Sequence, residues 1–195
     1  MAKVIVVTGI AGVGKTTVLN ELRNLASEAK VRLNVVNFGT VMNEILRDLG
    51  KELHRDDMRR QDIDLQRKVQ DLAASEIVNR AQEHLVVVDT HMFIRTATGL
   101  WAGLPNHVLQ RLSPNLLILV ETSPAEILGR RRSDRSRERD QITEEEVAFD
   151  IAWSRSTASA CALVTGCPVR IIRNDPGMAR QAAQELLQLI RDLGA

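Results

Sequence analysis

Short apolar runs alternate with longer amphipathic stretches along the whole chain. Apolar residues that recur at helical spacing predict helices over residues 14–29, 40–49, 62–83, 124–132, 143–163 and 178–192. Runs rich in β-branched residues predict strands at residues 4–8, 33–38, 85–89, 116–121 and 169–173. Because apolar strands separated by helices are typical of a covered parallel sheet, the pattern predicts an α/β fold with a five-stranded parallel sheet and helices on both faces. Binding groups are expected at the carboxyl ends of its strands.

One helix boundary is marked by a specific local pattern. Thr143 is followed three residues later by Glu146, immediately before an apolar-periodic run. This is the spacing of a capping box, in which each side chain bonds the backbone N–H of the other residue. We therefore expect a helix to begin directly after Thr143.

Composition favours a single domain over residues 1–195 and argues against a membrane partner or nucleic-acid binding as the main role. The chain is 44% hydrophobic, enough for a sizeable core, and its formal net charge is only +1. Aromatic residues make up 3%, too few for platforms that stack single-stranded nucleic acid. No apolar run approaches the roughly 20 residues that span a bilayer. We expect a cytoplasmic protein.

Residues 9–16 fit the phosphate-loop pattern G-x-x-x-x-G-K-[ST] between the first predicted strand and the first predicted helix. Three glycines let the backbone turn sharply and direct its N–H groups to phosphate oxygens. Lys15 can reach the β- and γ-phosphates, and Thr16 can place its hydroxyl on Mg²⁺. The chain is therefore expected to bind a nucleoside triphosphate. The residues expected to contact it in this segment are Gly9, Ile10, Ala11, Gly12, Val13, Gly14, Lys15, Thr16 and Thr17.

An acid ends the third predicted strand. Asp89 lies where a carboxylate can support Mg²⁺ opposite Thr16, although an acidic cap after a strand is the simpler alternative. Arg95 follows shortly and is expected over the same edge of the sheet. Guanidinium groups stay charged when desolvated and bind phosphate bidentately, so they suit the movement of phosphoryl charge.

Two polar segments interrupt the alternation. Residues 50–62 lie within an excursion between the second and third strands (about residues 38–83), and residues 130–140 carry six arginines within a short lid (about residues 130–141). We expect the excursion to cover a second substrate and the lid to cover the triphosphate. A solvated helix end and contacts with RNA backbone are the alternatives for the arginines.

The second predicted strand ends without an acid. It runs into Asn37, Phe38, Gly39 and Thr40, so no carboxylate is present to take a proton from a hydroxyl acceptor. An acceptor that is already a phosphate anion needs only positive charge and alignment. The sequence thus favours a nucleoside monophosphate acceptor over a sugar or shikimate-type one. A switch GTPase is disfavoured because no Asn-Lys-x-Asp segment follows the fourth strand.

Several motifs together resemble the archaeal-type adenylate kinases, and the resemblance covers essentially the whole chain. The motifs are Gly-Ile-Ala-Gly-Val-Gly-Lys-Thr-Thr at 9–17, Asn-Phe-Gly-Thr-Val-Met at 37–42, Arg-Asp-Asp-Met-Arg at 55–59, Asp-Thr-His at 89–91, Gly-Leu-Pro at 103–105, and Glu-Thr-Ser with Glu-Ile-Leu at 121–128. The resemblance implies Mg²⁺-dependent phosphoryl transfer between ATP and AMP, a lid without zinc-binding cysteines, and a homo-oligomer, frequently a trimer.

The resemblance also implies roles for individual residues. It assigns Lys15, Arg95, Arg139 and Arg155 to catalysis, and Arg130 and Arg135 to the triphosphate. Arg137 would belong to the same lid. The residues expected to contact the substrate are Phe38, Gly39, Met42, Arg59, Asp89, His91 and Arg95. Two alternatives stay open: a kinase for another monophosphate such as CMP or UMP, and an adenylate-kinase-like ATPase that acts on ribonucleoprotein.

Overall fold

The computed structural model describes residues 3–50, 63–96, 99–133 and 143–194. Most of the polar segment at 50–62 and of the lid lies outside these ranges. Four of the arginines named above are therefore not described, namely Arg59, Arg135, Arg137 and Arg139.

The core of the fold is a five-stranded parallel sheet with the strand order β2-β3-β1-β6-β7. The strands are β1 (Val4–Thr8), β2 (Leu33–Asn37), β3 (Leu85–Asp89), β6 (Leu116–Glu121) and β7 (Val169–Arg173). All five predicted strands are confirmed, with β2 ending one residue earlier than expected. β1 and β6 are buried along their whole length because they lie inside the sheet and are covered on both faces.

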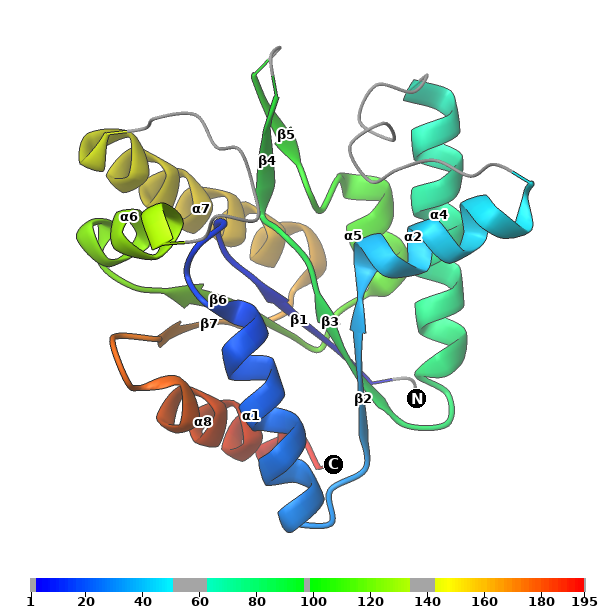
Figure 1. Ribbon diagram of the computed structural model, residues 1–195. Coiled ribbons are helices and arrows are strands. Elements are labelled where there is room, and N and C mark those ends of the chain that lie inside the picture. The colour runs from blue at the N-terminus through cyan, green and yellow to red at the C-terminus, as the bar shows by residue number, and fades with distance from the viewer. Residues whose placement is uncertain (1–2, 51–62, 97–98, 134–142, 195) are drawn as a thin grey trace.

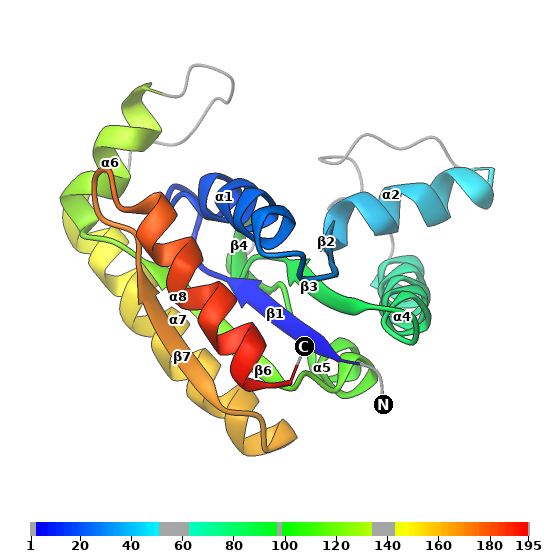
Figure 2. The ribbon, with the colours of Figure 1, turned by 90° about the horizontal axis from the view of Figure 1, so that it is seen from below.

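Helices cover both faces of this sheet. Figure 2 shows α1 (Lys15–Glu28) and α8 (Ala179–Asp192) side by side on one face, and α5 (Asn106–Leu112) and α7 (Glu144–Thr165) on the other. The buried side chains of α8 recur at helical spacing and include Ala183, Leu186 and Ile190. The α/β fold expected from the sequence is confirmed.

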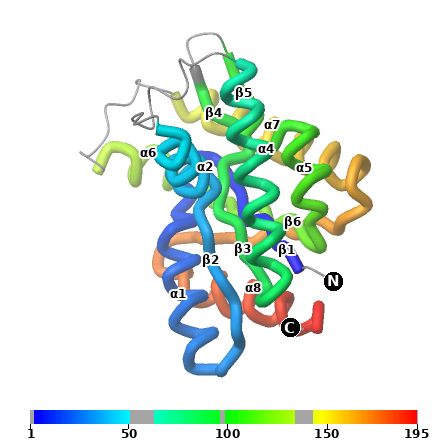
Figure 3. Tube along the Cα trace, turned by 90° about the vertical axis from the view of Figure 1, so that its right-hand side faces the viewer, coloured from blue at the N-terminus to red at the C-terminus, as the bar shows by residue number. Residues whose placement is uncertain are grey.

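The excursion between β2 and β3 is built from helices that stand beside the sheet. α2 (Phe38–Asp48) begins directly at the end of β2, and α4 (Ile63–Arg80) packs against it. Figure 3 shows both helices next to the β2–β3 edge. On the other side of the sheet, α6 (Pro124–Ser133) follows β6 and carries the first arginines of the lid.

The structure adds two features that the hydrophobic pattern did not predict. An antiparallel hairpin of β4 (Phe93–Thr96) and β5 (Gly99–Ala102) projects beyond the carboxyl ends of the parallel strands (Figure 1). The short helix α5 follows it. Each strand of the hairpin has four residues, too few for the alternation of apolar and polar positions to stand out. Among the helices of the described ranges, none is both long and apolar enough to cross a membrane.

The capping box at the start of α7 is confirmed. The Thr143 hydroxyl accepts from the N–H of Glu146 at 3.2 Å, and the Glu146 carboxylate accepts from the N–H of Thr143 at 2.8 Å. The bond from the Thr143 N–H is the largest cause of a lowered pKa at the Glu146 carboxyl. Two backbone donors of the first helical turn are satisfied in this way.

The capping box gives a prediction about stability. Thr143→Ala removes one of its two bonds, so the free energy of unfolding should fall by about 1 kcal/mol. Urea denaturation followed by circular dichroism would measure it. Ser156→Ala, within the same helix and exposed, is the control and should be neutral. Equal effects of the two substitutions would contradict a capping role for Thr143.

Candidate nucleotide site

The loop of residues 9–14 joins the carboxyl end of β1 to the first turn of α1. Gly14 is the N-cap of α1, and its φ of 85° is a left-handed conformation that favours glycine. No side chain caps this helix end. Its first N–H groups are therefore available to an anion, which the positive end of the helix dipole also attracts.

Lys15 lies at the beginning of α1 and is buried, with 7% of its surface exposed. Its Nζ donates to the carbonyl oxygen of Gly9 at 3.2 Å, so the ammonium spans the loop from its end back to its start. Thr16 and Thr17 follow on an exposed part of the helix. The structure thus places the loop, the lysine and the Thr16 hydroxyl at one sheet edge, as the motif predicted.

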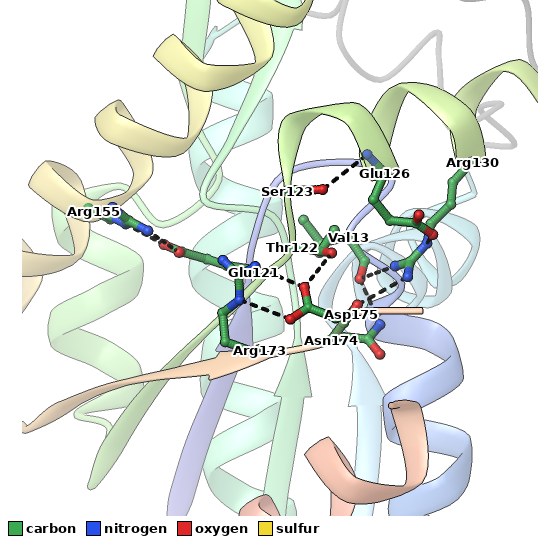
Figure 4. A network of polar contacts seen from close by, with 10 residues as sticks. All are labelled: Val13, Glu121, Thr122, Ser123, Glu126, Arg130, Arg155, Arg173, Asn174 and Asp175. Atoms are coloured by element: carbon green, nitrogen blue, oxygen red, sulfur yellow. Dashed lines mark hydrogen bonds and ion pairs between the residues drawn. The ribbon is translucent and has the colours of Figure 1, made fainter. Parts of the chain in front are cut away.

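Arg130 on α6 lies against the same loop. Figure 4 shows its guanidinium between three acceptors: the carbonyl oxygen of Val13 at 2.9 Å, that of Asn174 at 3.0 Å, and the carboxylate of Glu126 at 2.7 Å. The arginine was expected to contact ATP phosphate. In this structure its guanidinium binds two backbone carbonyl oxygens, one of them in the loop, and one carboxylate. Contact with phosphate stays a prediction.

Asp89 ends β3 beside β1 and has one unsatisfied oxygen. Its Oδ2 accepts from the Asn37 amide at 2.8 Å, while Oδ1 is buried with no hydrogen-bond partner. The hydroxyl of Thr8, at the end of neighbouring β1, is also buried without a partner. Unpaired buried oxygens are costly, and a cation with its bound water would satisfy them.

These groups fit Mg²⁺ in the way a phosphate loop requires. Within the described ranges no cluster of three or more His, Cys, Asp and Glu could form an all-protein metal cage. Mg²⁺ bound with substrate phosphates needs only one or two protein oxygens and keeps several waters. Asp89 and the hydroxyl of Thr16 are therefore sufficient as candidate protein ligands.

A cleft opens next to Asp89, between α2, α4 and the hairpin. It measures about 830 Å³ with its open mouth included. The cleft brings together most of the described residues that were expected to contact the substrate. They are Phe38, Gly39, Met42, Asp89 and His91.

Other lining residues of this cleft were not among those expected to contact the substrate, although Gly103 belongs to the Gly-Leu-Pro motif. Gln66 comes from α4, while Trp101 and Gly103 come from the hairpin and the residues after it. A Cβ atom on Gly103 would collide with the carbonyl oxygen of His91, so this close approach requires glycine. Nothing in the sequence indicated that Gln66 or Trp101 would lie here, because only the packing of α4 and of the folded hairpin brings them to the cleft.

Arg95 and Arg155 are each held by a buried carboxylate. Arg95 on β4 donates to Asp150 of α7 at 3.1 and 2.6 Å, and Arg155 of α7 donates to Glu121 at 2.8 and 2.6 Å (Figure 4). Both carboxylate side chains are only 3% exposed. The bond to Glu121 raises the pKa of Arg155 above its usual value. Glu121 was noted in the sequence only as part of the Glu-Thr-Ser motif, and Asp150 was not noted at all.

The fold and the phosphate loop define an α/β protein of the P-loop class. A solved shikimate kinase from Bacteroides thetaiotaomicron superposes with a TM-score of 0.61 at 14% identity, covering 98% of this chain and 99% of that one. A protein of Thermus thermophilus superposes with a TM-score of 0.56 at 14% identity, covering 100% and 98%. At this identity the likeness shows the fold alone.

The sequence comparisons identify the family. A family model described as an AAA domain matches residues 8–148. Adenylate kinases of Methanoculleus marisnigri and Methanocaldococcus jannaschii are 40% and 39% identical, covering 98% and 97% of this chain and 100% and 98% of theirs. That of Pyrococcus furiosus is 38% identical, covering 97% of this chain and 96% of its own. This chain belongs to the adenylate kinase family.

The bond between the exposed Arg155 side chain and the buried Glu121 carboxylate gives a second prediction about stability. Arg155→Ala removes the bidentate partner of a buried carboxylate, so the free energy of unfolding should fall by about 1–3 kcal/mol. Adding Glu121→Gln should restore part of this loss, because a neutral amide is cheaper to bury than an unpaired charge. Urea denaturation of both variants would measure this.

The control for this prediction is an exposed ion pair. Arg170 and Glu185 approach to 3.2 Å with side chains 59% and 41% exposed. Arg170→Ala should cost less than about 1 kcal/mol. A loss at Arg155 no larger than that at Arg170, or a double variant less stable than Arg155→Ala alone, would contradict the prediction.

Proposed function

We propose that this protein catalyses reversible transfer of the γ-phosphoryl group of MgATP to AMP, which yields two molecules of ADP. The observation that carries the proposal is the position of Asp89, which ends β3 beside the phosphate-loop strand and also lines the cleft. A triphosphate on the loop and a monophosphate in the cleft would then meet at one edge of the sheet. The adenylate kinases to which the chain is similar support this substrate pair.

The donor side is formed by the loop and the start of α1. Backbone N–H groups and the helix dipole bind the phosphate oxygens, and Lys15 places its ammonium on the β- and γ-phosphates. Loop residues 9–14, with Thr16 and Thr17, form the remainder of this side. Since these donors are fixed before the reaction, they stabilise the charge of the transferred group without reorganising.

The acceptor side is formed by the cleft. Phe38 and Met42 supply apolar surface for a flat base, while His91 and the amide of Gln66 supply polar groups within the cleft. Asp89 is the only carboxylate that lines the cleft among the described residues. An AMP phosphate needs no general base, because it attacks as an anion and requires only alignment and neutralised charge.

Arginines neutralise the charge that develops between the two substrates. We assign Arg95 and Arg155 to this role. Arg59 would act on the AMP side, and the lid would contribute Arg130, Arg135, Arg137 and Arg139. Of these lid residues, Arg139 would also be catalytic. The carboxylate of Asp150 holds Arg95 near the end of β4, and that of Glu121 holds Arg155 in the middle of α7. Guanidinium groups that stay charged when desolvated suit a closed site from which water is excluded.

Mg²⁺ would supply positive charge that offsets the negative charge of the phosphate groups. The residues that would hold it are Thr16 through its hydroxyl and Asp89 through water. The unpaired Oδ1 of Asp89 supports this assignment. The single-domain organisation, the cytoplasmic location and the homo-oligomer, frequently a trimer in this family, stay predictions.

The proposal is tested by measuring ADP formation with a panel of monophosphates. AMP should be the preferred acceptor over CMP and UMP, and hydrolysis of ATP without an acceptor should be slow. If CMP or UMP were the preferred acceptor, the protein would be a kinase for that monophosphate instead. ATP hydrolysis stimulated by ribonucleoprotein, without AMP turnover, would favour the ribonucleoprotein ATPase.

Lys15 gives a third prediction. Lys15→Ala should lower kcat by at least ~100-fold, because it removes a charge placed on the transferred phosphoryl group. Lys30→Gln is the matched control, since Lys30 is exposed just beyond the other end of the same helix. A folded Lys15→Ala protein with the turnover of the control would refute the assignment.

Asp89 gives a fourth prediction. Asp89→Asn should raise the Mg²⁺ concentration for half-maximal activity by about 10- to 100-fold. This is the usual effect of changing a group that binds a metal ion through its coordinated water. Titrating Mg²⁺ after chelation would measure the shift. Asp71→Asn, in an exposed pair with Arg111, should leave the titration unchanged. An unchanged Mg²⁺ requirement in Asp89→Asn would remove this residue from the metal site.

A further inference from the structure

The outer side of the phosphate loop is bound by two side chains that the loop motif does not contain. Asn174 follows β7, is 3% exposed, and donates from Nδ2 to the Val13 carbonyl oxygen at 2.8 Å. Arg131 of α6 donates to the Ala11 carbonyl oxygen from Nε at 2.8 Å and from a terminal nitrogen at 2.6 Å. The sequence predicted no contact of either side chain with the loop, although Arg131 is one of the six arginines of the expected lid.

These bonds fix the orientation of two peptide groups. The described chain contains no cis peptide bond, so each carbonyl points opposite to the N–H of the next residue. Holding the Ala11 carbonyl against α6 therefore turns the N–H of Gly12 away from α6. Holding the Val13 carbonyl against Asn174 turns the N–H of Gly14 away from the turn after β7.

The support behind Asn174 is itself rigid. Its backbone N–H donates to the carbonyl oxygen of Glu121 at the end of buried β6, at 2.8 Å. Its own carbonyl oxygen accepts from Arg130, which also binds the Val13 carbonyl (Figure 4). A Cβ atom on Gly14 would lie 2.5 Å from the Asn174 amide nitrogen, so the loop and the amide are in close contact.

We propose that Asn174 and Arg131 are positioning residues for the triphosphate site. By holding the carbonyl oxygens of Val13 and Ala11, they keep the N–H groups of Gly14 and Gly12 directed at the phosphate oxygens. They act through the loop backbone and need no contact with the nucleotide. This inference rests on the proposed function, because it requires the loop to bind a triphosphate.

Asn115, directly before β6, provides a control at the opposite end of β1. Its Oδ1 accepts from the N–H of Val4 at 2.8 Å, so an asparagine side chain also bonds backbone at the amino end of β1. Removing either asparagine removes a side-chain bond of equal length to the β1 region. Only the bond at Asn174 lies at the phosphate loop. If both asparagines were merely structural, removing either side chain should affect stability but leave tripolyphosphate affinity unchanged.

The test is calorimetric titration of the full-length chain with magnesium tripolyphosphate, which has no base or ribose, and separately with AMP. Asn174→Ala should weaken tripolyphosphate binding by about 10- to 100-fold, because a Gly14 N–H that is no longer held in place loses its hydrogen bond to a charged phosphate oxygen. The KM for ATP should rise while AMP affinity stays unchanged. Asn115→Ala should lower Tm without changing either affinity.

Arg131 supplies an independent variant should Asn174→Ala not fold. Arg131→Ala should weaken tripolyphosphate binding, and Arg131→Lys, which keeps one donor for the Ala11 carbonyl, should recover part of it. Equal affinities of Asn174→Ala and wild type, or no difference between the Ala and Lys variants of Arg131, would overturn the positioning role. Wild-type protein that binds neither tripolyphosphate nor ATP would instead overturn the proposed function.

Discussion

The rest of the site depends on one constraint, which is that the loop after β1 must present backbone N–H groups to an anion. Backbone polar groups that leave water need partners, and turning N–H groups to one side turns the carbonyls to the other. The carbonyl oxygens of Ala11 and Val13 find donors on α6 and after β7. The loop motif is a local sequence pattern, but its carbonyl oxygens are bound by residues more than a hundred positions away in the chain.

The parallel sheet explains why two ligand sites lie together. The carboxyl ends of parallel strands lie at the same edge of the sheet. The loop after β1 and Asp89 at the end of β3 therefore become neighbours, although they lie far apart in the sequence. The excursion of α2 and α4 and the β4–β5 hairpin then line the second site at this edge. Without the hairpin, Trp101 and Gly103 would not reach the cleft.

Buried carboxylates fix the orientation of two arginine side chains at this site. Arg95 and Arg155 each bind a carboxylate that is almost fully buried, which fixes the guanidinium plane and orients its exposed edge. Burying Asp150 and Glu121 is tolerated because each retains a bidentate partner. The stability of the fold and the placement of positive charge at the sheet edge thus rest on the same bonds.

The sequence by itself determined the parallel sheet, the phosphate loop and the capping box at Thr143, because these depend on periodicity and on spacings within a few residues. It also carried the family resemblance. The hairpin, the cleft and the partners of the arginines were decided only by the tertiary structure. Four-residue strands carry little periodic signal, and the bonds of Asp150 to Arg95 and of Asn174 to Val13 join residues 55 and 161 positions apart. Such contacts form only when the sheet brings its strand ends together, since no local pattern specifies which distant side chain will arrive there.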